Sequence, residues 1–226
     1  MSIGRFCLLL ATAIFIFAPS TSHGITLGQV DTFSFGGAFG WTNGGSQVGG
    51  PPPVGPNDLY FRWQSMGSGG VLKRIDNTSQ WSGNYAAAGV TGIEMDLINF
   101  TTSVEHMNVN LAVASFYSDG YGSTTAFDLP PDAQWHPAIF SLTAGSMTGD
   151  PQAPPFANVL ANVKSLTIFD GLGPNFVDSG LVGFGVDNIR AVPEPASISI
   201  LVSGIICVVL MSRRLKSRRE NGPPVG

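Results

Sequence analysis

The stretch Ile93-Glu94-Met95-Asp96-Leu97-Ile98 decides the fold class of this chain. Its apolar side chains at 93, 95 and 97 alternate with carboxylates at 94 and 96, and a period of two places each set on one face of a β-strand. The same period recurs at 109–116 and 166–169, and 181–189 continues as an apolar stretch to the end of the body. Helical periodicity is confined to one short predicted turn at 160–164. The chain is therefore predicted to be all-β.

Further strands are predicted at 30–35, 59–66, 123–129 and 138–142. Turn-forming residues separate them, for example Gly49-Gly50-Pro51 and Pro130-Pro131. About eight short strands in one domain favour a single β-sandwich, and a jelly roll is the expected form.

The composition excludes several classes of protein. Of the 226 residues, 43 % are hydrophobic and only 12 % are charged, which argues against a disordered chain or a coiled coil. The net charge is -4, whereas contacts with phosphates need a basic face, so no nucleic-acid partner is expected.

Residues 1–24 are predicted to be a secretory signal peptide. Arg5 precedes an apolar run at 7–18 that is too short to span a membrane stably, and small residues follow it. Ser22 and Gly24 suit the positions before a cleavage site at Ile25. Cleavage after Ser20 or Ser22, or an uncleaved anchor, are the alternatives.

The other end of the chain, 192–219, is predicted to anchor it in the inner membrane. The sequence Val192-Pro193-Glu194-Pro195 precedes an apolar run at 196–211, and five basic residues follow between 213 and 219. A helix of sixteen residues is about 24 Å long, whereas the hydrocarbon core of a membrane is about 30 Å thick. Snorkelling arginines extend the span, so a transmembrane helix is predicted at 196–212. The positive charges keep residues 220–226 cytoplasmic.

These residues resemble the PEP-CTERM sorting signal of Gram-negative bacteria. The resemblance implies that exosortase, a membrane enzyme, recognises Val192, Pro193, Glu194 and Pro195 and releases the body towards the cell surface or extracellular matrix. Arg213 and Arg214 would set the orientation of the helix. Such proteins typically occur in bacteria that make extracellular polysaccharide. An ordinary tail anchor behind a proline stalk is the alternative.

The exported body, 25–191, has its own composition. It contains five basic and thirteen acidic residues, a net charge of about -8, and no cysteine, because Cys7 and Cys207 lie in the flanking segments. It is large enough for one domain. Several stretches resemble the galactose-binding-like jelly roll of many carbohydrate-binding modules: Gly40-Trp41-Thr42, 88–93, Trp135 before 139–142, and Gly185-Val186-Asp187-Asn188-Ile189.

Two pairs of carboxylates are candidate sites. The jelly-roll resemblance implies that Asp31 and Asp187, on the opening and closing strands, hold a structural calcium ion; capping of turns is the alternative. Glu94 and Asp96 share one face of a strand, about 6.6 to 7 Å apart, which is within the range used by glycosidases. A solvated strand face explains this second pair equally well.

Aromatic residues in Gly- and Ser-rich stretches are candidate glycan contacts, because exposed rings stack on sugars. These residues are Trp81, Tyr85, Tyr117 and Tyr121, and burial is the alternative that any single ring favours. Trp63 and Trp135 are expected to pack in the core or against a sheet. The sequence contains none of the common hydrolase, metalloprotease or nucleotide-binding motifs.

The sequence therefore predicts an exported, surface-sorted, non-catalytic β-sandwich associated with extracellular polysaccharide. A glycan-binding module is the first hypothesis. A structural surface protein without a small ligand is the second, and a carboxylate-based hydrolase is the third.

Overall fold

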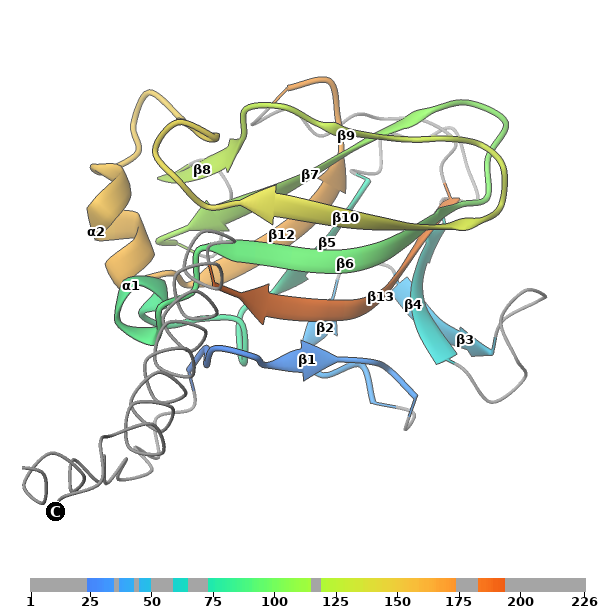
Figure 1. Cartoon of the computed structure of the whole chain (residues 1–226), viewed down its shortest axis with the longest axis horizontal. Helices are drawn as coiled ribbons and strands as arrows, with labels where there is room; N and C mark the ends of the chain where they lie inside the picture. The colour runs from blue at the N-terminus through green and yellow to red at the C-terminus, as the bar shows by residue number, and fades with distance from the viewer. Residues whose placement is uncertain are drawn as a thin grey trace, which may run out of the picture.

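The computed structural model describes residues 24–34, 37–42, 45–49, 59–64, 73–114, 119–173 and 183–193. Within them the chain forms two antiparallel β-sheets that pack face to face (Figure 1). The prediction of an all-β sandwich is confirmed.

Sheet A has six strands and is centred on the last strand of the chain. Its order is β10-β6-β13-β4-β3, and β1 pairs with β13 beyond the end of β4. The strands are β1 (Val30–Asp31), β3 (Gly45–Gly49), β4 (Leu59–Gln64), β6 (Gly92–Asn99), β10 (Trp135–Ser141) and β13 (Gly183–Val192).

Sheet B has seven strands in the order β11-β8-β7-β12-β5-β2, with β9 also paired to β7. The strands are β2 (Trp41–Thr42), β5 (Arg74–Asn77), β7 (Glu105–Ala112), β8 (Gly120–Ser123), β9 (Phe127–Leu129), β11 (Met147–Gly149) and β12 (Ser165–Asp170).

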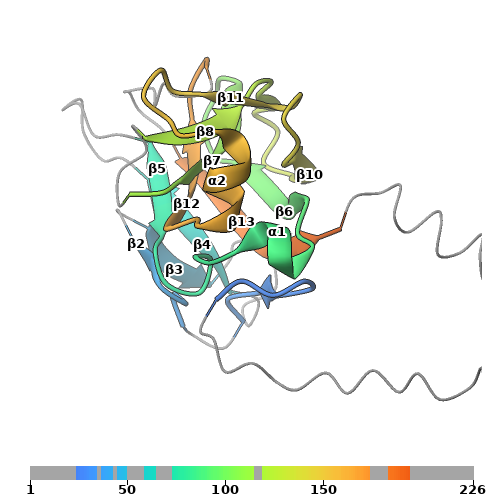
Figure 2. The ribbon, with the colours of Figure 1, turned by 90° about the vertical axis from the view of Figure 1, so that its left-hand side faces the viewer.

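The core lies between the sheets and follows the predicted alternation. Ile93, Met95 and Leu97 of β6 are buried against residues of β7 and β12. Two short helices, α1 (Tyr85–Ala88) and α2 (Phe156–Ala161), lie at one end of the sandwich (Figure 2). Each inserts one buried side chain into the core, Tyr85 from α1 and Val159 from α2.

Some predicted boundaries were wrong for identifiable reasons. The strand predicted at 30–35 ends at Asp31, because Phe33 has a positive φ of 55° that turns the chain away from the sheet. The strand predicted at 123–129 is two strands, β8 and β9, that pair with different parts of β7.

A β-bulge in β13 controls which residues face outward. Asp187 pairs with Asp96 and Arg190 pairs with Glu94, so β13 uses three residues where β6 uses two. Asn188 takes up the extra residue with a φ of 50°. The side-chain alternation of β13 therefore changes phase, and Ile189 enters the core.

Candidate functional site

The outer face of sheet A combines aromatic rings with carboxylates. Since Ile93, Met95 and Leu97 face the core, Glu94, Asp96 and Ile98 face outward. Cross-strand pairing extends these positions into two rows across the sheet. The rows are Trp135–Ile98–Gly185–Arg62 and Pro137–Asp96–Asp187.

Three rings and one guanidinium form a cluster on this face, which we call the ring cluster. Tyr60 stacks on Phe100 with ring centroids 5.8 Å apart and meets Trp135 edge-on at 5.3 Å. The Arg62 guanidinium lies 4.5 Å from the centre of the Phe100 ring. Both contacts between rings have geometries that aromatic pairs favour. The cluster therefore holds the half-buried Trp135 ring in a defined orientation.

Gly185 makes room for the ring cluster. A Cβ atom there would lie 2.9 Å from two carbons of the Tyr60 ring and 2.7 Å from Ile98 Cγ2. The missing side chain lets the Tyr60 ring lie flat across β13. This is a close-packing role for glycine and involves no unusual backbone angle.

Two polar atoms of the ring cluster are buried without a hydrogen-bond partner in the described part of the chain, Tyr60 Oη and Arg62 Nε. Burial raises the pKa of the Tyr60 hydroxyl, and the positive charge of Arg62 opposes that rise only in part. The hydroxyl thus keeps its proton and is available as a donor. Unpaired buried donors are uncommon in proteins and call for an explanation.

Hydrogen-bond acceptors lie next to the rings. Asp96 and Asp187 are cross-strand neighbours, and Asn188 bonds to both, donating from Nδ2 to Asp96 Oδ2 at 2.8 Å and from its backbone N–H to Asp187 Oδ1 at 2.7 Å. Glu94 and Asp96 share this face, as predicted, and Glu94 lies opposite Arg190. Glu94 and Asp96 thus form part of a half-buried polar surface beside the ring cluster.

The carboxylates of Asp31 and Asp187, predicted to share a calcium ion, lie on opposite faces of sheet A. Asp31 points into the core and accepts hydrogen bonds from Trp41 Nε1 at 2.8 Å, Trp81 Nε1 at 2.7 Å and Gln80 Nε2 at 2.6 Å. Asp187 faces outward, because Phe184 and Val186 before it alternate into the core and the bulge comes only after it. Within the described ranges, no group of three or more His, Cys, Asp and Glu side chains is placed to hold a metal ion. The calcium expectation therefore does not fit these residues.

Two of the four aromatic residues predicted to contact glycans are buried instead. Trp81 and Tyr85 are fully buried, with their polar atoms bonded to Asp31 and to the Trp81 carbonyl. Tyr121 is half-buried and packs on Phe156 with centroids 4.9 Å apart. Tyr117 lies outside the described residues. The sequence analysis correctly predicted that Trp135 packs against a sheet. It did not predict that Trp135 lies on the outer face of β10, where its ring is half-buried.

The predicted sorting motif lies mostly outside the described residues. Only Val192 and Pro193 fall within them, at the end of β13, whereas Glu194, Pro195, Arg213 and Arg214 do not. In the part of the chain that the structure describes, no helix is long and apolar enough to cross a membrane. The predicted signal peptide and the helix predicted at 196–212 lie outside that part.

A buried charge cluster lies at the end of sheet B where β12 ends and β5 and β7 begin. Lys73 Nζ lies 2.8 Å from Asp170 Oδ2 and 3.6 Å from Glu105 Oε2. Burial, followed by the hydrogen bond and the charge of Asp170, raises the pKa of Glu105 to about 8, although Lys73 and a hydrogen bond from Thr101 act in the opposite direction. Glu105 is therefore protonated at neutral pH.

Comparison with known proteins finds similarity in structure only. No protein-family model matches the chain, and no curated protein matches its sequence. The solved structure of PfGH50B superposes with a TM-score of 0.50 and 9 % identity, covering 75 % of this chain and 24 % of that one.

Two other solved structures have slightly lower scores. One is a Family 11 carbohydrate-binding module from Clostridium thermocellum, in complex with a β-1,3-1,4-mixed-linked tetrasaccharide. Its TM-score is 0.48 at 14 % identity, and the superposition covers 75 % of this chain and 98 % of the module. An exo-β-agarase has a TM-score of 0.47 and 9 % identity, with 74 % of this chain covering 26 % of it.

The chain spans about a quarter of the length of PfGH50B and of the agarase, but nearly all of the Family 11 module. At these identities the likeness concerns the fold alone.

Proposed function

We propose that this chain is an exported, non-catalytic β-sandwich of the jelly-roll type that binds polysaccharide on the outer face of sheet A. The observation that carries the proposal is the ring cluster. Trp135 is half-exposed, fixed by Tyr60, and flanked by carboxylates and an amide on neighbouring strands.

The face supplies the two kinds of contact that a sugar needs. A sugar ring has an apolar face of C–H groups, which packs on an aromatic ring, and an edge of hydroxyls, which form hydrogen bonds. Trp135 offers the first contact, and Pro137 and Ile139, the latter 57 % exposed, continue an apolar stripe along β10. The half-buried Asp96 and Asn188 offer the second.

The test is binding of the exported protein to agarose and to β-1,3-1,4-glucan, by affinity electrophoresis and calorimetry. We expect Trp135→Ala to weaken binding at least tenfold, which corresponds to about 1.4 kcal/mol. Tyr121→Ala is the matched control, since it removes a half-buried ring from the other sheet, and it should bind as the parent does. Equal affinity of the two variants would contradict the assignment of the face.

A wider glycan panel completes the test. If no polysaccharide binds the parent protein, the proposal fails and the chain is better described as a structural surface protein.

We further propose that residues 1–24 direct export, and that exosortase acts at Val192–Pro195 before the body reaches the surface or matrix. This second proposal rests on the sequence motif and on the basic residues after it.

A further inference from the structure

The buried charge cluster of Lys73, Glu105 and Asp170 brings an amine and two carboxyl groups together inside the sandwich. In sheet B, β12 lies between β5 and β7 (Figure 1). Lys73 stands directly before β5, Glu105 begins β7 and Asp170 ends β12, so all three lie at one end of the sheet. Their exposed fractions are 6 %, 2 % and 2 %. The three groups are therefore removed from bulk water.

Strand pairing directs the three side chains to the same side of sheet B. Each of them stands two residues from a core-facing residue of its own strand, and these core residues are Ile75, Met107 and Ile168. Lys73 and Asp170 are also joined through the backbone, because Asp170 N donates to Lys73 O at 2.9 Å. The fold thus places the amine and the carboxyl group on directly neighbouring strands, with Glu105 on the strand beyond.

The reacting atoms are close and held in place. Lys73 Nζ lies 2.8 Å from Asp170 Oδ2 and 3.6 Å from Glu105 Oε2. The backbone N–H of His106 donates to Asp170 Oδ1 at 2.6 Å, and Thr101 Oγ1 donates to Glu105 Oε1 at 3.1 Å. These bonds fix both carboxyl groups beside the amine. Holding two reactants in contact in this way replaces a slow encounter by an effectively unimolecular step.

Glu105 supplies the acid that such a step needs. It is protonated at neutral pH, because burial and the neighbouring Asp170 raise its pKa to about 8, and it is hydrogen-bonded to Asp170. A carboxylic acid in this position can polarise the neighbouring carboxyl group and pass protons between the amine and the departing oxygen. The cluster therefore contains a nucleophile, an acyl group and a proton-transfer group.

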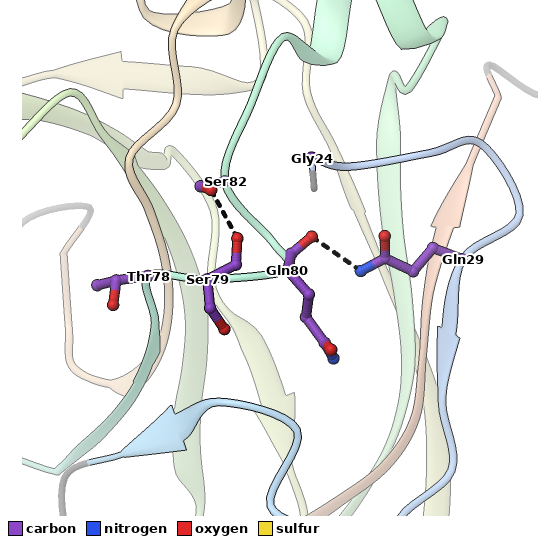
Figure 3. A pocket seen from close by; sticks show the side chains of 6 residues that line it. All are labelled: Gly24, Gln29, Thr78, Ser79, Gln80 and Ser82. Carbon is purple, nitrogen blue, oxygen red and sulfur yellow. Dashed lines mark hydrogen bonds between the residues drawn. The ribbon is translucent and has the colours of Figure 1, made fainter. Parts of the chain in front are cut away.

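The hydrogen bonds at the turn before α1 have a different chemistry. There Gln29 Nε2 donates to Gln80 O at 3.1 Å, and Ser82 Oγ donates to Ser79 O at 2.6 Å (Figure 3). These bonds join amide and hydroxyl groups to backbone carbonyls, which do not condense with one another. Lys164, the other lysine in the described part of the chain, is exposed. The buried cluster is thus the place where an amine meets an acid away from water.

We propose that Lys73 and Asp170 condense into an intramolecular amide cross-link, with Glu105 as the proton-transfer group. The Lys73 ammonium passes one proton to the Asp170 carboxylate, which leaves a neutral amine and a neutral acid. Nζ then attacks Cγ of Asp170, and Glu105 takes a second proton from Nζ while it gives its own to the departing oxygen. The Nζ–Cγ bond forms, one Cγ–O bond breaks and one water leaves. No oxidant or other reactant takes part.

The cross-link would tie β5 to β12 across 97 residues of the chain. Cysteines are absent from the sequence at 25–191, so the amide would supply the covalent link that a disulfide supplies in other exported proteins. The burial of Glu105, the largest cause of its raised pKa, is the same before and after the reaction. The inference does not rest on polysaccharide binding, which involves the other sheet.

Trypsin digestion of the denatured full-length protein, followed by mass spectrometry, tests the proposal. Trypsin cuts after the basic residues that flank both partners, but after Lys73 only where that side chain is free. We expect a branched peptide that joins 63–74 to 165–190, with a mass below the sum of the two by one water, about 18 Da. Recovery of 63–73 and 165–190 as linear peptides, without the branched one, would overturn the proposal.

Two substitutions separate the reaction from the ion pair. Lys73→Arg keeps the positive charge but removes the attacking amine, and Glu105→Gln keeps the shape of the side chain but cannot pass on a proton. We expect no branched peptide in Lys73→Arg and a yield about tenfold lower in Glu105→Gln. Lys164→Arg and Glu94→Gln are the matched controls and should cross-link as the parent does. A yield in Glu105→Gln equal to that of the parent would contradict the proposed reaction.

Discussion

Asp31 shows how burial decides the role of a single carboxylate. Its oxygens accept from two indole N–H groups and one amide, which join β1, β2 and the turn before α1. Such bonds to a charged acceptor are stronger than those between neutral groups. Asp31 therefore acts as an internal connector between elements far apart in the chain.

We expect Asp31→Ala to lower the free energy of unfolding by about 3–5 kcal/mol, because it leaves two buried indole N–H donors and the half-buried Gln80 amide unpaired. Urea unfolding followed by tryptophan fluorescence measures the loss. Asp128→Ala, at an exposed aspartate, should cost less than about 1 kcal/mol. Addition of EDTA should leave the Tm of the parent unchanged, and a clear drop in Tm would show that a bound cation stabilises the fold.

Glu105 gives the protein a predictable pH dependence. In the unfolded chain its pKa is about 4.5, and in the folded protein burial and Asp170 raise it to about 8. The folded state therefore holds one more proton between these values. The resulting stability is fully present below about pH 4.5 and is lost as the pH rises through about 8.

The corresponding prediction is that Glu105→Gln flattens the decline of stability between about pH 5 and 9, since glutamine has no proton to lose. Denaturant midpoints across this range measure the effect. The control is Glu94→Gln, which changes a half-buried carboxylate on the outer face of sheet A. An equally steep decline in Glu105→Gln and in the parent would contradict the assignment.

At the scale of the elements, β13 sets the shape of the outer face of sheet A. Asp187 lies next to Asp96 on this face, the bulge at Asn188 turns the following Ile189 into the core, and Gly185 receives the Tyr60 ring. The neighbouring strands β6 and β10 show regular alternation. The polar and aromatic parts of the candidate site are thus both organised by one strand.

Gly185→Ala should displace the ring cluster. The new methyl group would meet Ile98 and Tyr60 at less than 3.0 Å, so we expect a loss of about 1–3 kcal/mol in stability and weaker polysaccharide binding. Gly145→Ala is the control, because a Cβ atom there meets nothing within 4 Å. Calorimetric melting and affinity electrophoresis test both effects, and a Gly185→Ala protein that matches the control in both would contradict this account.

At the scale of the whole molecule, β1 and β13, the first and last strands that the structure describes, pair with each other in sheet A. Val30 of β1 pairs with Arg190 of β13, the predicted cleavage before Ile25 lies outside β1, and the predicted motif begins at Val192, the last residue of β13, which pairs with Gly92. Cleavage at either site would remove none of the strand residues before Val192. The fold is therefore compatible with removal of both predicted flanks.

The sorting proposal predicts that Glu194→Ala blocks removal of the tail and leaves the body folded. Fractionation of cells and intact-mass measurement follow the tail, and the unfolding midpoint of the purified protein follows the body. Ser199→Ala, within the apolar run, serves as the control. Normal tail removal in Glu194→Ala would count against the motif, and an altered midpoint would show that Glu194 contributes to the fold.

The local pattern predicted several features because they depend only on nearby residues. Alternation at 93–98 identified β6 and placed Glu94 and Asp96 on one face, and both predictions are confirmed. The same reasoning could have identified Trp135 as outward, since Ala138 and Phe140 of β10 face the core. Sequence reasoning failed for Trp81 and Tyr85, because a Gly- and Ser-rich neighbourhood does not reveal that distant partners bury them.

The sequence by itself determined the all-β class and the outward face of β6, because a period of two is a local property of the chain. Only the tertiary structure decided which side chains meet. Asp31 meets Trp81 from fifty residues away, and Trp135 meets Tyr60 across four strands. These contacts depend on strand register and on a one-residue bulge, and a shift of one residue moves every side chain of a strand to the opposite face.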